Sequence, residues 1–478
     1  MATSEMTPEA RSDLKGDQLS AFNLTYLVLA AVAPLAAVVS AVPLVILGVG
    51  VGAPGMYVAT SLVLLFFAIG YTKMSRHVNK PGAFYAYITL GLGPWVGMAA
   101  AAIAATCYCL ILVGIAGITS GFATSIFESV FDWSVPAPVW AAVVIVLIGF
   151  TGRRGVELNA RILTVVFTIE ILLVLTLDAT ILVRNGFGAF SLDVFNPSNV
   201  FSGAPGIAFA FAASSFMGFE ATAIYYREAK DPLKTVPRAT FAAVGLVSIF
   251  LILASWSLIA GNGGSSAQSV AEQDPARFVF ATMHDQLGSG GETIMELLFL
   301  ISFMACAMST LNAAARYVYS LSRDKLLPSQ LGRVHSKHAS PYVASAVLVV
   351  FAAAILTAGF LSGLDPYLVI GVATVGLATV GIISLQAVVC IAAIAYFWRR
   401  PERNWWTTVI APALGAAGMT TGVVLTLANW DLIGTTSVGY VNNLPWLLLV
   451  VVIAMLAYGA RLRRKDRASF DRFASSAG

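Results

Sequence analysis

The chain has 478 residues, of which 58% are hydrophobic and 11% charged, and its formal net charge is +4. Soluble domains carry about 25% charged residues, so this composition excludes an ordinary soluble protein and indicates one integral membrane domain. The four cysteines fall inside apolar runs, and the four histidines lie in loops or at segment ends without metal-site spacing. We therefore expect neither a disulfide framework nor a metal centre, and no cofactor.

About twelve apolar segments are long enough to cross a bilayer, which takes about 20 helical residues. Threaded with the N-terminus inside, they leave 26 of the 28 Lys and Arg on the cytoplasmic side. An excess of this size predicts a multi-pass protein of the cell membrane with both termini cytoplasmic. The predicted spans are 24–47, 54–75, 95–124, 137–151, 156–183, 203–226, 239–261, 292–320, 342–361, 366–397, 407–429 and 443–461.

The first predicted span contains Pro34 and Pro43 around a run of small residues. Pro34 removes a backbone donor and clashes with the preceding turn, so we expect the helix to kink or open between Ala33 and Val38. The sixth span, about 180 residues later, is interrupted by a serine pair and Gly218. Two interrupted segments at matching places in two halves are typical of a transporter site in an inverted repeat, although ordinary proline kinks are the alternative.

Three acidic side chains lie at membrane depth, Glu170 and Asp178 in the fifth span and Glu220 in the sixth. A charge at the centre of a membrane helix costs roughly 3 kcal/mol on insertion scales, so such acids should face protein or a water-filled cavity. Glu170 and Glu220 are candidate functional groups, with a structural hydrogen bond as the alternative for each. In the third span, Tyr108 is a candidate to hydrogen-bond a substrate, or else to join two helices.

Two polar regions outside the spans also carry patterns. In the outer segment 261–291, Phe278, Phe280 and Met283 fit one side of a short amphipathic helix, although an ordinary surface loop is equally expected from periodicity alone. The basic tail Arg461–Arg467 is explained by contact with anionic lipid headgroups. We therefore expect no nucleic-acid partner.

Two stretches resemble a known family. The stretch SFMGFEATAIYYREAKDPLKTVPRAT (215–240) resembles the sixth-helix signature of the amino acid, polyamine and organocation (APC) transporter superfamily. The stretch 308–344 contains Asn-x3-Arg, Ser-Arg-Asp-x-x-Leu-Pro and Ser-Pro-x-x-Ala, and it resembles the eighth helix and inner loop of the same family. Together with hydropathy, the resemblance extends over roughly residues 20–460.

The resemblance implies an all-α membrane fold of about twelve transmembrane helices, with a five-plus-five inverted repeat of the LeuT-like type and two further helices. The expected parts are a polar cytoplasmic tail (1–20), the first repeat (21–200), the second repeat (201–398), helices eleven and twelve (399–462) and a basic cytoplasmic tail (463–478).

An amino acid in the bilayer interior needs partners for its carboxylate and its ammonium, and broken helices provide free amides and carbonyls. The resemblance implies amides near Ala36–Val38 and carbonyls near Ser215–Met217. Family members commonly have Gly-Ser-Gly at the first break, where this chain has Ala-Ala-Val, so an amine or polyamine is the alternative substrate. Ser214 stands where an arginine-specific relative has an aromatic lid. Phe216 is the nearer candidate to close over a ligand, with core packing as the equal alternative. The candidate substrate-binding residues are Ala36, Ala37, Val38, Tyr108, Ser214, Ser215, Phe216, Met217 and Gly218.

For energy coupling we prefer protons to sodium. Some proton-coupled relatives have a lysine 15 residues after a glycine of the fifth helix, and the same count from Gly155 gives Glu170. Ser309 and Thr310 are hydroxyls where sodium-coupled relatives place ion ligands, but a sodium site takes about five or six oxygens. We therefore predict proton coupling through Glu170 and Glu220, with Ser309 and Thr310 as a possible ion site.

The predicted function is secondary active transport of an amino acid by alternating access, most simply as a proton symporter. Import of a polyamine or related amine, and exchange of one solute for another, are the alternatives. A channel would need a ring of filter residues and a continuous pore, and an enzyme would need a clustered nucleophile, base or metal set. The expected partners are a small solute and the lipid bilayer, and the sequence makes no prediction of the oligomeric state.

Overall fold

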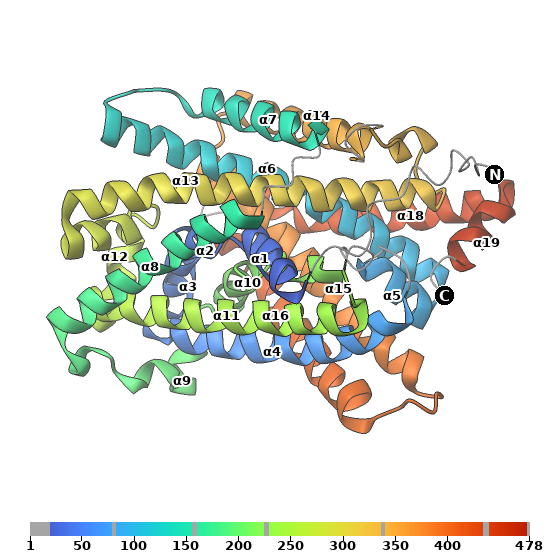
Figure 1. Ribbon diagram of the computed structural model, residues 1–478, viewed down its shortest axis with the longest axis horizontal. Coiled ribbons are helices and arrows are strands. Elements are labelled where there is room, and N and C mark those ends of the chain that lie inside the picture. The colour runs from blue at the N-terminus through green and yellow to red at the C-terminus, as the bar shows by residue number, and fades with distance from the viewer. Residues whose placement is uncertain are drawn as a thin grey trace, which may run out of the picture.

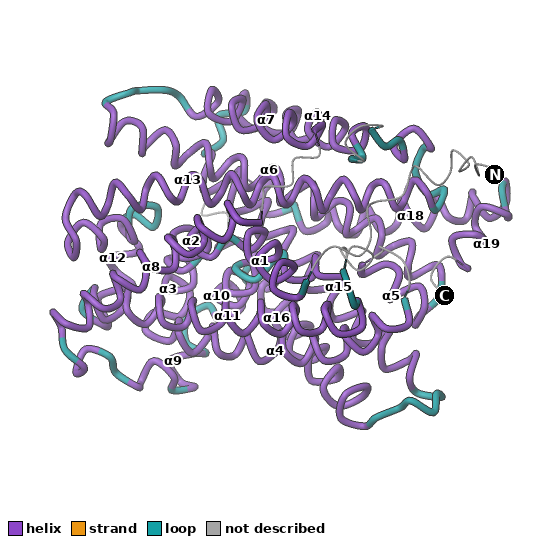
Figure 2. Tube along the Cα trace, in the orientation of Figure 1, coloured by secondary structure: helices purple, strands orange, loops and turns teal. Residues whose placement is uncertain are grey.

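The computed structural model describes residues 20–78, 83–154, 160–223, 229–335, 340–433 and 439–475. Within these ranges the chain is helical almost throughout and contains no β-strand (Figure 1). Figure 2 shows the same chain as helices joined by short loops. The predicted all-α class is confirmed. The predicted N-terminal tail lies outside the described residues, except for Ser20.

The helices follow one another along the chain with few long connections. The first nine are α1 (Ala21–Val32), α2 (Pro34–Ser40), α3 (Val42–Val49), α4 (Ala53–Met74), α5 (Ala83–Leu92), α6 (Pro94–Phe131), α7 (Ala137–Arg154), α8 (Ala160–Asn185) and α9 (Pro197–Val200). The others are α10 (Pro205–Ser214), α11 (Pro232–Gly261), α12 (Ala267–Gln273), α13 (Phe278–Arg323), α14 (Tyr342–Leu361), α15 (Thr374–Phe397), α16 (Ala411–Ala428), α17 (Gly439–Asn442), α18 (Pro445–Lys465) and α19 (Arg467–Ser475).

In the described ranges, ten segments are helical, apolar and long enough to cross a membrane, and two shorter apolar helices correspond to α7 and α10. These agree with the predicted number of about twelve spans. α14 has the predicted bounds, whereas α11 begins at Pro232 instead of residue 239. Proline is favourable at the first helical position, and the helix then continues through polar residues, so the hydropathy pattern located the edge of the apolar region and not the helix start.

The long helices enclose the interrupted ones. α6 packs against α13, α15, α5 and α7, and α4 packs against α11, α16 and α15, while α10 lies among α3, α4, α15 and α16. α7 and α14 pack against each other at one edge, at the top of Figure 1. Four short helices therefore lie near the middle of the bundle: α1, α2, α3 and α10. The backbone groups at their ends are surrounded by protein.

The outer segment contains a short helix, as one of the two sequence interpretations expected. The helix begins at Phe278, and Gly288 interrupts it with a φ of 76°, a backbone conformation that favours glycine. Phe278, Phe280 and Met283 are all buried. These three side chains therefore pack inward and make the segment part of the protein core, which contradicts the alternative of an ordinary surface loop.

Candidate functional site

The first interruption lies at Ala33, between α1 and α2. Ala33 has a left-handed backbone (φ 47°, ψ 70°), and Pro34 begins α2. The reason is local, because Pro34 has no N–H and disfavours helical geometry in the residue before it. The interruption is therefore at the N-terminal edge of the predicted stretch, and Ala36–Val38 belong to α2, where the Ala37 amide donates to the Ala33 carbonyl at 3.0 Å.

The second interruption follows α10, which ends at Ser214. The hydroxyls of Ser214 and Ser215 donate to the Phe211 carbonyl at 2.7 and 2.9 Å, competing with the helical amide bonds. Gly218 has a φ of 112°, which an L-residue with a side chain rarely adopts, and a 3-10 turn covers Phe219–Ala223. The sequence therefore forces the chain out of helical geometry just before Glu220.

Glu220 is fully buried beside this interruption, and each of its oxygen atoms has a donor. Its Oε2 accepts the Gly218 amide at 2.9 Å and its Oε1 accepts the Tyr108 hydroxyl at 3.3 Å. The backbone carbonyl of Glu220 accepts the Tyr71 hydroxyl at 2.8 Å. These bonds fix the position of the carboxylate and compensate part of the cost of burying it.

A cavity of about 100 Å³ lies between the two interruptions, enclosed by α1, α2, α6, α13 and the end of α10. Its lining is mostly apolar, with hydroxyls and one thiol, and Glu220 is the one residue among those described there that is usually charged. The lining residues are Val32, Ala33, Ala36, Ala37, Ser40, Ala41, Tyr108, Ile111, Ile115, Ile118, Ser214, Met217, Gly218, Glu220, Phe303, Cys306, Ser309, Thr310, Ala313 and Val375.

The structure places many, but not all, of the predicted site residues at this cavity. Those that line it are Ala36, Ala37, Tyr108, Ser214, Met217, Gly218, Glu220, Ser309 and Thr310. Three predicted substrate-binding residues are buried outside the lining: Val38, Phe216 and Ser215. The Ser215 hydroxyl lies 3.3 Å from the hydroxyl of Tyr57, so it joins α10 to α4.

Sequence reasoning missed most of the apolar wall. Ile111, Ile115 and Ile118 lie on the same face of α6 as Tyr108, at the helical spacing of three and four residues. Phe303 and Cys306 are related in the same way to Ser309 and Thr310 on α13. Helical spacing could therefore have identified these residues. Tyr108 on α6, and Ser309 and Thr310 on α13, predict the other lining residues on the same faces.

Glu170 lies behind the first interruption and does not line the cavity. Its carboxylate is within hydrogen-bonding reach of the Ser302 hydroxyl and of the Leu35 amide, in the first turn of α2. The second carboxylate oxygen, Oε2, is buried without a hydrogen-bond partner among the described residues. The hydroxyl of α13 beside this acid is that of Ser302, whereas Ser309 and Thr310, the hydroxyls of the predicted ion site, line the cavity.

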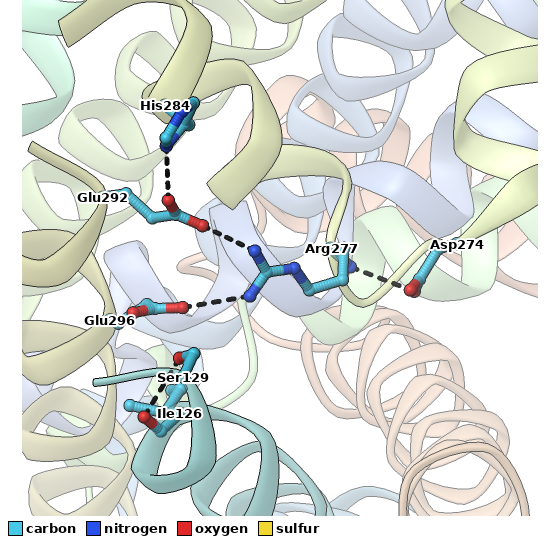
Figure 3. A network of polar contacts seen from close by, with 7 residues as sticks. All are labelled: Ile126, Ser129, Asp274, Arg277, His284, Glu292 and Glu296. Carbon is cyan, nitrogen blue, oxygen red and sulfur yellow. Dashed lines mark hydrogen bonds and ion pairs between the residues drawn. The ribbon is translucent and has the colours of Figure 1, made fainter. Parts of the chain in front are cut away.

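Tyr367 lies next to the cavity at Ser40, one of the lining residues. The hydroxyl of Tyr367 is 3.4 Å from the Ser40 carbonyl, and Tyr367 also lines a separate pocket of about 370 Å³. Beside this pocket, Arg277 bonds Glu292 at 2.6 Å and Glu296 at 3.2 Å, and His284 contacts Glu292 at 2.7 Å (Figure 3). These contacts join the segment before Gly288 to the helix after it.

A metal site has no support in the part of the chain that the structure describes, where no group of three His, Cys, Asp or Glu side chains is close enough to hold an ion. The candidate site is instead a small, largely apolar cavity with hydroxyls and one fixed carboxylate, and the two helix interruptions border it. Such a site can bind a small solute that carries a positive charge or hydrogen-bond donors.

Comparison with known proteins gives the family. Residues 19–456 match the family of amino acid permeases. A methylthioribose transporter of Bacillus subtilis is 24% identical over 75% of this chain and 78% of its own length. A branched-chain amino acid permease of the same bacterium is 24% identical over 69% and 72%, and a low-affinity putrescine importer of Escherichia coli is 24% identical over 73% and 75%. The resemblance seen in the sequence is confirmed: the chain belongs to the amino acid permease family, and it is a membrane transporter, not an enzyme.

Proposed function

We propose that the chain is a secondary active transporter that carries a small amino acid or amine across the cell membrane by alternating access, coupled to protons. The observation that carries the proposal is the cavity between the two helix interruptions, with the fixed carboxylate of Glu220 at its wall. Interrupted helices at mid-membrane are the usual way in which transporters of this type hold small charged solutes.

The amino group of the solute is assigned to the Glu220 side of the cavity. A cationic group there gains a charge-assisted hydrogen bond, whereas an anion would face a carboxylate with no Arg, Lys or His among the described lining residues. The face formed by Ile111, Ile115 and Ile118 suits an apolar side chain or alkyl stem. Relatives are named for branched-chain amino acids and for putrescine, and both kinds of solute combine an amino group with an apolar side chain or alkyl stem.

Ala36, Ala37, Ser214, Met217 and Gly218 complete the proposed substrate site as lining residues. Tyr108 is assigned to hold Glu220 in place through its 3.3 Å hydrogen bond. Ser309 and Thr310 line the cavity from α13 and are assigned to the solute instead of an ion. Val38, Ser215 and Phe216 are assigned a packing role, because they are buried outside the lining.

Glu170 is assigned to proton coupling, with Glu220 as the second protonatable group. Glu170 contacts the first turn of α2 at Leu35, so a change in its charge acts directly on the hinge at Ala33. Protonation removes the charge that faces the Leu35 amide, which weakens the contact between α8 and α2. Proton binding and hinge opening are thereby linked.

The proposed orientation has both termini in the cytoplasm, with repeats over 21–200 and 201–398 and two further helices over 399–462. The charge distribution of the loops supports it, because 26 of the 28 Lys and Arg fall on one side of the threaded chain. The interruption at Ala33 near the start of the first part, and that at Gly218 near the start of the second, support the two-repeat division.

Reconstitution into liposomes tests the proposal. Uptake of radiolabelled L-leucine and putrescine should saturate, show counterflow, and rise when the external medium is made acidic relative to the lumen. Glu170→Gln should abolish the response to the pH gradient while solute exchange persists. Flux that rises linearly with concentration and shows no counterflow would indicate a channel, and saturable uptake that ignores the gradient would remove proton coupling.

A further inference from the structure

The described C-terminal residues form a helix that packs against the protein. α19 follows α18 after a single residue, Asp466, whose extended backbone (φ −144°, ψ 75°) separates the two helices. The Asp466 carboxylate accepts the Ser469 hydroxyl at 2.6 Å and the Ser469 amide at 3.0 Å, a helix cap that lowers the pKa of Asp466. α19 is thus a separate capped unit on a one-residue hinge.

Two aromatic side chains, three residues apart on one face of α19, hold it against the protein. Phe473 is completely buried and its ring stacks on Tyr85 of α5, with 6.1 Å between centroids and 20° between planes. Phe470 is buried against Trp95 of α6, at 5.1 Å. The side chains of Arg467 and Asp471 are exposed and pair only loosely at 3.6 Å. The helix therefore has one docking face and one polar face.

Phe473 is the first ring of a column that ends at the cavity. Tyr85 packs edge-on against Tyr317 of α13 at 5.5 Å, and Tyr317 packs against Tyr108 of α6 at 5.6 Å. Tyr108 lines the cavity and hydrogen-bonds Glu220. The four rings are all buried, so they fill the space between the cavity and α19.

The column is also tied to the end of α13. The Tyr85 hydroxyl donates to Oδ2 of Asp324 at 2.9 Å, and Asp324 is itself buried. Figure 1 shows α5, the end of α13 and α19 gathered at one end of the molecule, with α12 at the other. In the proposed orientation this is the cytoplasmic end.

We propose that α19 closes the cytoplasmic route to the cavity: Phe473, seated on Tyr85, holds the aromatic column shut, and α19 must swing away about Asp466 before solute leaves to the cytoplasm. The inference rests on the proposed function and orientation. α19 has nine residues, and its contacts include the two aromatic ones and Arg463 of α18 over the Phe470 ring at 5.8 Å. A helix of this size is a small unit that can open locally while the rest of the fold stays intact. The exposed pair of Arg467 and Asp471 leaves that side of the helix free to move into water.

Two variants and a truncated chain test the proposal. Phe473→Ala removes the ring that packs on Tyr85, and truncation after Asp466 removes α19 altogether. Asp471→Ala changes an exposed residue of α19 and is the matched control. Hydrogen–deuterium exchange of the purified protein measures docking. We expect residues 467–475 to be protected in the wild type and in Asp471→Ala, and to exchange at least about tenfold faster in Phe473→Ala. Rapid exchange of this segment in the wild type would show that α19 does not dock, and would overturn the proposal.

Closure is measured separately, by labelling of Cys306, a natural thiol in the cavity wall. A water-soluble maleimide should modify Cys306 at least threefold faster in Phe473→Ala and in the truncated chain than in the wild type or Asp471→Ala, as read by peptide mass spectrometry. An unchanged labelling rate in a chain whose α19 has been released or removed would overturn the proposal. Should Phe473→Ala fail to run as a single species on gel filtration, the truncated chain decides this point.

Transport gives the third readout. Initial rates of exchange of L-leucine or putrescine should rise at least twofold in Phe473→Ala and remain at the wild-type value in Asp471→Ala. Absence of uptake in the wild type would count against the proposed function, while the Cys306 labelling still decides whether α19 closes the cavity. Fast labelling combined with an unchanged exchange rate would overturn the claim that α19 lies on the solute's route.

Discussion

Glu220→Gln is the substitution that tests the substrate site most directly. The Gly218 amide is fixed by the backbone and points at Oε2, so the oxygen of the new amide should take that place and keep the 2.9 Å bond. Its NH2 group then faces the Tyr108 hydroxyl, which can rotate to accept. The shape and the hydrogen bonds are therefore preserved, and the substitution removes chiefly the charge.

The expected loss follows from the bond that the carboxylate gives to an ammonium. A hydrogen bond to a charged group contributes about 1.5–3 kcal/mol, which corresponds to roughly 10- to 150-fold weaker binding at 1.4 kcal/mol per tenfold. We expect the concentration of L-leucine or putrescine that half-saturates uptake to rise by a factor in this range. The melting temperature without solute should change little.

The assay is uptake into liposomes, with binding to the purified protein followed by thermal shift. Asp178→Asn is the matched control, since Asp178 is also an acid at membrane depth but faces Ser257 and lies outside the cavity lining. Its half-saturation concentration should stay within about twofold of the wild type, because a residue that makes no solute contact contributes no binding energy. Wild-type binding and transport by Glu220→Gln would refute the assignment of the ammonium to this carboxylate.

Three further substitutions have expected outcomes. Gly218→Ala should lower the melting temperature, because its φ of 112° strains an L-residue by about 1–3 kcal/mol; an unchanged value would mean that the backbone relaxes without cost. Tyr71→Phe leaves the buried Glu220 carbonyl without its 2.8 Å donor and should cost about 1–3 kcal/mol, read from the same thermal assay; no loss would show that water replaces the hydroxyl. Ile115→Ala enlarges the cavity and should shift competition for uptake towards bulkier amines, whereas an unchanged preference would place the solute away from this wall.

The fold and the two interruptions could be predicted because their causes are local. Pro34 disrupts the residue before it in any context, and Gly218 after two serines disfavours a helix wherever the segment packs. The bounds of α14 were predicted in the same way, since the apolar run and the helix end together. α11 begins at Pro232, before its apolar run begins, and there the predicted start at residue 239 differed from the structure.

The partner of Glu170 could not be predicted, because it depends on how deep α13 sits beside α8. Ser302 and Ser309 are seven residues apart, so they lie on nearly the same face of α13 but about 10 Å apart along it, at 1.5 Å per residue. The sequence shows the stripe of hydroxyls and not its depth. α19 was missed for another reason: a nine-residue helix is too short for a search for membrane spans, and its two phenylalanines gain meaning only from Tyr85 and Trp95.

Both buried acids, Glu170 and Glu220, lie beside a backbone amide at a helix interruption. Glu220 accepts a backbone amide at the second interruption, from Gly218, and Glu170 lies within reach of one at the first, from Leu35. Each carboxylate could therefore serve only as a cap for a broken helix. Gln and Leu substitutions of Glu170 separate the two roles, since Gln still accepts from the amide whereas Leu cannot.

A capping role alone predicts that Glu170→Gln behaves as the wild type in every assay, and that Glu170→Leu loses about 1–3 kcal/mol of stability through the unpaired Leu35 amide. Coupling predicts that both variants lose the response of uptake to a pH gradient, although only Glu170→Leu is less stable. Melting temperature and gradient-driven uptake, measured on the same preparations, distinguish these patterns. A Glu170→Gln protein that is stable and still driven by the gradient would leave Glu170 as a cap and transfer the coupling role to Glu220.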